Sequence, residues 1–293
     1  MARSFPLIQL DVFAARPLEG NPLAVFTDGR GLSDGEMQAL AREMNLSETT
    51  FIIPRDSAVE QERGVRVRIF TVDEEIPFAG HPTLGTAFAI HRSTGAQEVA
   101  LELGVGRVPV RFEDPGRPAF GEMRQLDPTF GLVHDRAAVA RAVGVPVDAL
   151  DASLPIQTVS TGAPFVVVPF RSLAALQAVR LDLATADVYP RGVGARHFFL
   201  VSRETVDPAA RLHARMIFSG GEDPATGSAS GCAAAWMVAH GVAKPGERVL
   251  IEQGLEARRP SRLFVRAGRS GDRVDDVRVG GEVFEVMRGI VTL

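Results

Sequence analysis

The sequence predicts an α+β protein built from two copies of one module. A length of 293 residues suits about two domains, and predicted strands and helices alternate irregularly along the chain. Residues 65–69 and 276–279 alternate apolar with charged side chains, which is typical of half-buried strands in sheets with one solvated face. We therefore do not expect the sheets to be all parallel.

An internal repeat at an offset of 142 residues relates the two halves. It matches a turn and a buried strand in each half, and a His-Pro loop with an Asp-Pro loop: residues 21–26 with 163–168, and 81–87 with 223–229. Residues 68–71 resemble 216–219 at an offset of 148, which we interpret as six extra residues before the loop of the first half. In this alignment Asp223 replaces His81, and Ser228 pairs with Thr86.

Turn and breaker residues cluster in 113–131, which indicates a crossing between domains. We place the boundary near residue 130. The predicted domains are 1–130 and 131–280, and the C-terminal strand 281–293 is a candidate to complete the first domain.

The segment around Glu48 has clear local signals. Residues 33–36 have the spacing of a capping box, and apolar residues then recur at helical intervals, so we expect a helix that ends near Asn45. The β-branched run that follows stops at Pro54, which predicts a strand with Glu48 near its start.

Composition excludes several functional classes. A net charge of −4 and a pI near 5.9 provide no basic field for nucleic acid or anionic lipid. A single cysteine, Cys232, cannot form an internal disulfide. Gln9 and Asp11 interrupt the apolar residues of the N-terminus, so we expect no signal-peptide core there, and the longest small and apolar run, 232–239, is far shorter than a membrane span. We expect a cytoplasmic protein with no membrane or nucleic-acid partner.

Two glycine-rich loops, 78–86 and 220–228, each lead into small residues that favour a helix. A helix that opens on such a turn has unpaired backbone N–H groups, which suit a carboxylate or a developing enolate. Two loops in a duplicated chain suggest one shared site in an interdomain cleft. The alternative is that the glycines and hydroxyl groups only form tight turns and helix caps.

The chain resembles the PhzF-like isomerase family, which belongs to phenazine biosynthesis and is related in fold to diaminopimelate epimerase. The motifs that carry the resemblance are LDVF (10–13), GNP (20–22), NLSETTF (45–51), GHPTLG (80–85) and GEDPATGS (221–228). They occur in order along more than 200 residues.

The resemblance implies two pseudo-symmetric domains of diaminopimelate epimerase-like fold, each with a β-sheet curled around a central helix. It also implies an active-site cleft, no cofactor and a homodimer. It assigns acid/base catalysis to Glu48 and contact with the substrate, or support of proton transfer, to His81, Asp223 and Ser228. Gly80 and Gly227 would allow close backbone approach, and Ser47 is a weaker candidate.

We therefore expect a cofactor-independent isomerase that moves a proton within a small cyclic or unsaturated carboxylic or amino acid. In phenazine pathways the family's substrate is trans-2,3-dihydro-3-hydroxyanthranilate. An epimerase or racemase is one alternative, but the related enzymes use two cysteine thiols and this chain has one. Matching Phe51 to Phe198 places Ala195 opposite Glu48, so we expect no second base in the second half.

A protein that binds a metabolite or a protein partner without catalysis is the other alternative. No motif for a nucleotide cofactor is found, and no His or Cys pair has metal-ligand spacing, so we expect no metal.

Overall fold

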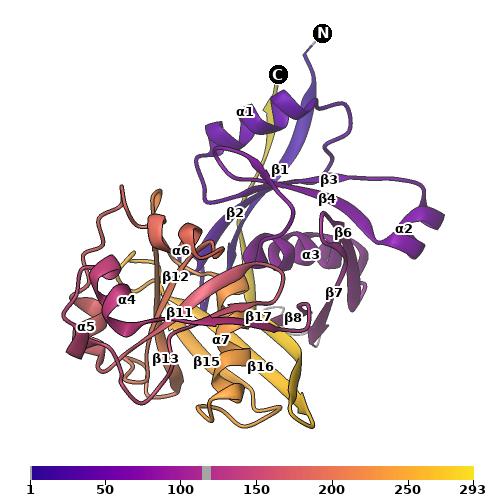
Figure 1. Cartoon of the computed structure of the whole chain (residues 1–293). Helices are drawn as coiled ribbons and strands as arrows, with labels where there is room; N and C mark the ends of the chain where they lie inside the picture. Colours follow the sequence, from indigo (N-terminus) through magenta and orange to yellow (C-terminus); the bar gives the residue numbers. More distant parts are fainter. Residues whose placement is uncertain (1, 114–119) are drawn as a thin grey trace. The chain divides into compact units, whose positions relative to one another are not determined.

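The computed structural model describes residues 2–113 and 120–293 (Figure 1). The chain divides into two compact units, residues 1–124 with 280–293, and residues 125–279. Residues 114–119 of the turn-rich segment 113–131 lie outside the described residues, and the rest of that segment includes strand β8 (Phe120–Arg124) and the start of strand β9 (Thr129–Val133). No helix in the described part of the chain is long and apolar enough to cross a membrane.

The described residues of the first unit form eight strands and three helices before the chain leaves it. They are β1 (Ser4–Val12), β2 (Asn21–Phe26), α1 (Asp34–Met44), β3 (Thr49–Ile53), α2 (Ser57–Arg63), β4 (Val65–Phe70), β5 (Glu75–Ile76), α3 (Gly80–Thr94), β6 (Glu98–Leu103), β7 (Gly106–Glu113) and β8 (Phe120–Arg124). The sheet is mixed, as expected: β2 pairs with β3 and β4 with β6 in parallel, whereas the hairpins are antiparallel.

The second unit has a similar order, but it begins with an additional strand and helix, and its described residues form no helix in the place of α2. It contains β9 (Thr129–Val133), α4 (Arg136–Val143), a 3₁₀ turn (Val147–Ala149), β10 (Gln157–Ser160), β11 (Pro164–Phe170), α5 (Leu173–Gln177), α6 (Val188–Gly192), β12 (His197–Ser202), β13 (Ala210–Phe218), β14 (Gly221–Asp223), α7 (Gly227–Ala239), β15 (Val249–Gln253) and β16 (Ser261–Ser270). Strand β17 (Arg273–Thr292) begins in this unit, and its last residues pair with β1 in the first.

A capping box fixes the start of α1, as predicted. The Ser33 side chain accepts from the Glu36 amide, and the Glu36 carboxylate accepts from the Ser33 amide. The helix ends at Asn45, which adopts a left-handed conformation with φ 51°. The chain then turns directly into β3, so Glu48 lies immediately before a strand, and this prediction is also confirmed.

Each unit has one helix that is buried on all sides. Every residue from 80 to 89 in α3 and from 227 to 238 in α7 is buried. Helix α3 contacts six strands of its own sheet, β1, β2, β3, β6, β7 and β8 (Figure 1). A helix that is apolar or small all round belongs in a core, so the α+β fold with a sheet curled around a central helix is confirmed.

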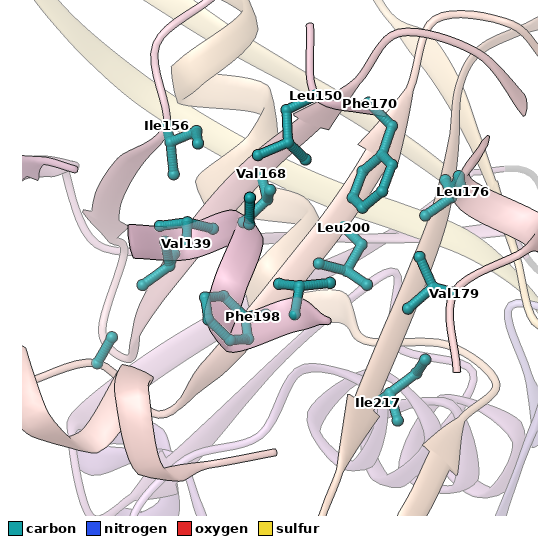
Figure 2. Packing of buried hydrophobic residues seen from close by; sticks show 14 residues of the cluster. Val139, Leu150, Ile156, Val168, Phe170, Leu176, Val179, Phe198, Leu200 and Ile217 are labelled. Atoms are coloured by element: carbon teal, nitrogen blue, oxygen red, sulfur yellow. The ribbon is translucent and has the colours of Figure 1, made fainter. Parts of the chain in front are cut away.

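The sheet of the second unit is also covered on its other face. Alternate residues of β11 and β12, among them Val168, Phe198 and Leu200, pack against α4 and α5 through Val139 and Leu176 (Figure 2). The intervening residues of both strands are buried as well. Burying each such side chain contributes roughly 1.5–3 kcal/mol, and the two covered faces hold these strands rigidly under α7.

The register of the internal repeat differs from the predicted one at the loops. Helices α3 and α7 begin at Gly80 and Gly227, which are 147 residues apart. The hairpins before these helices show the same offset of 147 residues. Ile69 pairs with Ile76 in the first hairpin, and Met216 pairs with Asp223 in the second.

The predicted pairing of His81 with Asp223, and of Ser228 with Thr86, is therefore wrong. Ser228 is the counterpart of His81, and Ile76 is the counterpart of Asp223. The first half has no six extra residues before its loop. The short Pro-Gly match at an offset of 142 misled the alignment because both loops contain a proline followed by glycine and hydroxyl residues.

Two helical glycines differ in what a methyl group would meet. A Cβ at Gly85 in α3 would lie 2.5 Å from a methyl carbon of Leu23 and 2.8 Å from one of Val12, whereas a Cβ at Gly35 in α1 would meet nothing. We expect Gly85→Ala to lower the free energy of unfolding by about 1–3 kcal/mol through overpacking. Gly35→Ala, the matched control, should raise it by up to about 1 kcal/mol through helix propensity. Urea denaturation measures both, and equal effects of the two variants would contradict this account of the core.

Candidate active site

Glu48 and His81 lie together in the first unit. Glu48 Oε2 is 3.5 Å from His81 Nδ1, and the two side chains are 16% and 4% exposed. Glu48 comes directly before β3, and His81 is the second residue of α3, after Gly80. The structure thus brings the two residues with the strongest predicted roles into one place.

A hydrogen bond between the two elements fixes this arrangement. Thr50 Oγ1 in β3 and Thr86 Oγ1 in α3 lie 2.8 Å apart, and both side chains are fully buried. Thr50 is the second residue of β3 and follows Glu48 by two residues. Ser47 lies half-buried in the turn before them.

Asn21 completes the group and was not among the predicted site residues. Its Nδ2 lies 3.3 Å from His81 Nδ1, and the residue is fully buried as the first residue of β2. The GNP motif at 20–22 was the available signal. Its asparagine looked like a turn residue, and only the tertiary structure shows that it faces His81.

Burial lowers the pKa of His81 to about 3, and an interaction with the Pro22 backbone opposes this shift only in part. The imidazole is therefore neutral near pH 7. A neutral ring can hold the Glu48 carboxyl group in either protonation state, because Nδ1 can accept a hydrogen bond from the protonated carboxyl group or, in the other tautomer, donate a hydrogen bond to the carboxylate. Among residues 2–113 and 120–293, the buried Nε2 of His81 has no hydrogen-bond partner.

In the second unit, Asp223 ends β14 and lies before α7. Thr226 Oγ1 donates to Asp223 Oδ2 at 2.6 Å, and both residues are buried. Gly227 is the first residue of α7, and its carbonyl accepts from Gln125 Nε2 at 3.0 Å. Ser228, the second residue, is buried. Thr226 was missed as a site residue although it lies inside the GEDPATGS motif.

The second unit also offers a basic group that the predicted alignment excluded. The strand pairings place Phe51 and Leu200 at equivalent positions, because Phe51 pairs with Arg68 and Leu200 with Arg215, and these two arginines are related by the offset of 147 residues. His197, not Ala195, is then the counterpart of Glu48, and that prediction is wrong. Phe51 and Phe198 share a residue type, but the strand pairings show that they do not occupy equivalent positions in the two sheets.

His197 forms a hydrogen-bonded pair with a carboxylate. Its Nδ1 lies 2.7 Å from Asp187 Oδ1, and Asp187 Oδ2 accepts from the Ser219 amide at 3.2 Å. Burial lowers the pKa of His197 more than the Asp187 hydrogen bond raises it. The ring is therefore neutral near pH 7, with its orientation fixed by Asp187.

Cys232 lies in the buried part of α7. Its thiol is 3.5 Å from Thr161 Oγ1 and from the Ala163 carbonyl, and burial raises its pKa to about 11. A thiol with this pKa carries almost no thiolate near pH 7, and the thiolate is the nucleophilic and basic form. Among the described residues, no group of three or more His, Cys, Asp or Glu side chains is arranged to hold a metal ion.

The lowered pKa of His81 gives a pH prediction. Unfolded His81 would titrate near 6.5 and folded His81 near 3, so the unfolded state binds the extra proton and stability falls as the pH drops below about 6.5. Between pH 7 and pH 5 wild type should lose on the order of 2 kcal/mol more unfolding free energy than His81→Gln. Urea denaturation at both pH values measures this, and nitrogen-15 NMR should show no titration of the His81 ring. A ring that titrates between pH 5 and pH 7 would contradict the assignment.

Comparison with known proteins agrees with this geometry. The family model of the PhzC-PhzF phenazine biosynthesis-like proteins matches residues 10–289. Trans-2,3-dihydro-3-hydroxyanthranilate isomerase of Pseudomonas aeruginosa is 37% identical over 282 residues, which cover 94% of each chain. An uncharacterized isomerase of Mesorhizobium japonicum is 37% identical over 292 residues, with 95% of this chain and 96% of that protein covered.

Solved structures give the same family. A predicted epimerase of Pseudomonas aeruginosa superposes with a TM-score of 0.85 at 37% identity, covering 98% of this chain and 99% of its own. A PhzF-family protein of Bacillus anthracis has a TM-score of 0.87 at 26% identity, with 99% and 100% covered. A hydroxyproline epimerase of Agrobacterium vitis, at 13% identity, covers 99% of this chain and 93% of its own with a TM-score of 0.66, and shares the fold alone. The chain is therefore an isomerase of the PhzC-PhzF family of phenazine biosynthesis-like proteins.

Proposed function

We propose that this isomerase moves a proton between two carbons of a small cyclic or unsaturated carboxylic or amino acid, with Glu48 as the acid/base group and without a cofactor. The contact between Glu48 Oε2 and His81 Nδ1 carries the proposal, because it combines a carboxylate with a buried neutral imidazole. The identity to trans-2,3-dihydro-3-hydroxyanthranilate isomerase makes that compound the candidate substrate.

The reaction needs no net change of oxidation state. The Glu48 carboxylate removes a proton from carbon, and the electron pair of that C–H bond enters the conjugated system of the substrate. The protonated Glu48 then returns the proton to a second carbon as the double bonds shift. General acid/base catalysis by a positioned group typically contributes about 10²–10⁴-fold in rate.

The buried imidazole supports both halves of this cycle. His81 keeps Glu48 in place whether or not the carboxyl group carries the proton. Its Nε2 is buried and has no hydrogen-bond partner in the described part of the chain, so a polar atom of the substrate would satisfy it. The resemblance adds contact of Asp223 and Ser228 with the substrate and a homodimer to the same proposal, and the composition with its single cysteine adds a cytoplasmic location.

Thiol-based epimerisation or racemisation is disfavoured by the state of Cys232. That alternative needs reactive thiols, and the one thiol of this chain is buried with a pKa near 11. A protein that only binds a metabolite has no chemical need for an acid/base carboxylate, and turnover measurements distinguish this alternative directly.

The first test is Glu48→Gln, which keeps the shape of the side chain and removes the acid/base group. We expect its turnover to fall by roughly 10²–10⁴-fold. Proton NMR in D₂O follows double-bond migration in trans-2,3-dihydro-3-hydroxyanthranilate. Glu43→Gln on the exposed face of α1 is the control and should behave as wild type. Turnover by folded Glu48→Gln at the wild-type rate would contradict the acid/base assignment.

A second prediction concerns Cys232. We expect Cys232→Ser to retain wild-type turnover, because the thiol is too buried and too weakly acidic to react. Native protein should also resist a thiol reagent that labels the urea-unfolded chain. Loss of turnover in a folded Cys232→Ser variant would restore thiol chemistry as the mechanism.

A further inference from the structure

Asp223 belongs to a buried polar cluster that reaches back to Gln253, the last residue of β15. Gln253 Nε2 donates to the Asp223 carbonyl at 2.8 Å and to Thr226 Oγ1 at 2.9 Å. Gln253 Oε1 accepts from the Thr226 amide at 3.1 Å. Thr226 Oγ1 in turn donates to the Asp223 carboxylate, so one directed chain of hydrogen bonds runs from Gln253 through Thr226 to Asp223.

Gln253 is well suited to fix this loop. Its side chain is fully buried, and both ends of its amide are hydrogen-bonded to the loop between β14 and α7. The next residue, Gly254, has φ +80°, and a Cβ there would lie 2.5 Å from the Pro224 carbonyl oxygen. The end of β15 is thus pressed against the loop, and any side chain at residue 254 would push it away.

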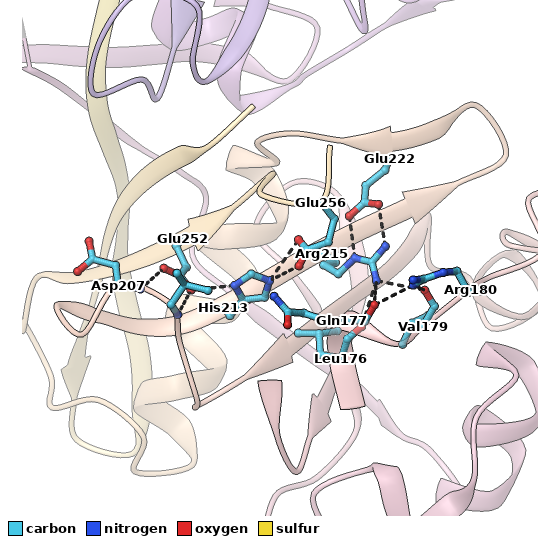
Figure 3. Close-up of polar contacts among 11 residues, drawn as sticks. Leu176, Gln177, Val179, Arg180, Asp207, His213, Arg215, Glu222, Glu252 and Glu256 are labelled. Carbon is cyan, nitrogen blue, oxygen red and sulfur yellow. Dashed lines mark hydrogen bonds and ion pairs between the residues drawn. The ribbon is translucent and has the colours of Figure 1, made fainter. Parts of the chain in front are cut away.

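Charged side chains hold the residues next to Asp223 and Gln253, the two ends of this series of hydrogen bonds (Figure 3). Glu222, next to Asp223, makes two hydrogen bonds of 2.8 Å with Arg215. Glu252, next to Gln253, accepts from His213 at 2.8 Å and from the amides of Val206 and Asp207. These anchors leave the backbone on each side of the polar cluster little freedom to move.

Burial alone lowers the pKa of His213, but hydrogen bonds and charges of Glu256 and Glu252 outweigh it and hold that pKa above its ordinary value. The raised pKa favours the imidazolium, which can donate to both carboxylates at once.

The first unit shows that the fold does not require this polarity. The counterparts of Asp223 and Thr226 are Ile76 and Ala79, 147 residues earlier. The counterpart of Gln253 is Leu103, the last residue of β6. Like Gln253 it is followed by a glycine that packs against the loop proline, Gly104 against Pro77. The three positions that are polar in the second unit are therefore occupied by apolar residues in the first unit.

We propose that Gln253 is a positioning residue: through Thr226 it fixes the Asp223 carboxylate and the start of α7 where they meet the substrate. The inference rests on the proposed contact of Asp223 with the substrate. An aspartate side chain otherwise samples several rotamers, and a misplacement of about 1 Å in an active site can cost about 10²-fold in rate. The Thr226 hydroxyl selects one rotamer, and the Gln253 amide fixes the hydroxyl.

The test is a double-mutant cycle between Thr226→Val and Asp223→Asn, with turnover of trans-2,3-dihydro-3-hydroxyanthranilate as the readout. Valine keeps the shape of threonine and removes the hydroxyl group. We expect Thr226→Val to lower kcat about 10–100-fold in wild type and to have almost no further effect in Asp223→Asn. Thr226→Ser, which keeps the hydroxyl group, should recover most of the loss.

Gln253→Leu introduces the residue found at this position in the first copy. It should also lower kcat in wild type and have almost no further effect in Asp223→Asn. The control is Gln157→Leu, because Gln157 is a buried glutamine of the same unit whose amide bonds Gly131 and His240. Its effect on kcat should be independent of Asp223. Amide hydrogen exchange without substrate should be at least about tenfold faster at Thr226 in Gln253→Leu than in wild type or Gln157→Leu.

The outcomes separate the two proposals. Wild type that leaves the substrate unchanged would remove the proposed substrate, and unaltered exchange at Thr226 in Gln253→Leu would overturn the positioning inference by itself. Active wild type in which the effects of Thr226→Val and Asp223→Asn multiply would also overturn the inference while the proposed function stands. Loss of the Thr226→Val effect in the Asp223→Asn background supports both.

Discussion

The burial of one helix inside each sheet is the constraint on which the rest of the structure depends. A helix that begins in the interior exposes its first N–H groups where no bulk water reaches them, so the residues that lead into it must be placed accurately. In each unit a short strand, a proline and a close-packed glycine, Gly104 or Gly254, determine that entry. The candidate site residues His81 and Ser228 occupy the same second position of the two helices.

The same backbone supports different chemistry in the two copies. In the first, a neutral His81 faces Glu48, and the residues around the helix entry are apolar. In the second, His197 stands where Glu48 stands and is oriented by Asp187, and the helix entry carries Asp223. Divergence of side chains on a duplicated scaffold lets each copy keep its packing while its polar groups specialise.

The sequence predicted the individual helices and strands better than it predicted which residues of the two copies are equivalent. Capping at Ser33, the strand after Glu48 and the helices after Gly80 and Gly227 follow from local signals that act within a few residues. The repeat register could not be read this way, because insertions and deletions shift the offset from 142 at β2 to 149 at β3 and then to 147 at the helices. Asn21 and Gln253 were missed for a related reason: their partners lie 60 and 27 residues away.

Burying polar groups costs free energy, so the buried polar residues at the helix entry of the second unit need an explanation. An amide and a carboxylate in the interior lose their hydration, and hydrogen bonds return only about as much as was lost. Apolar residues of similar size would pack the same space without that cost, as Ile76, Ala79 and Leu103 do in the first unit. The polar set in the second unit is therefore not explained by stability, and the one carboxylate at its end, Asp223, is the group whose placement the set controls.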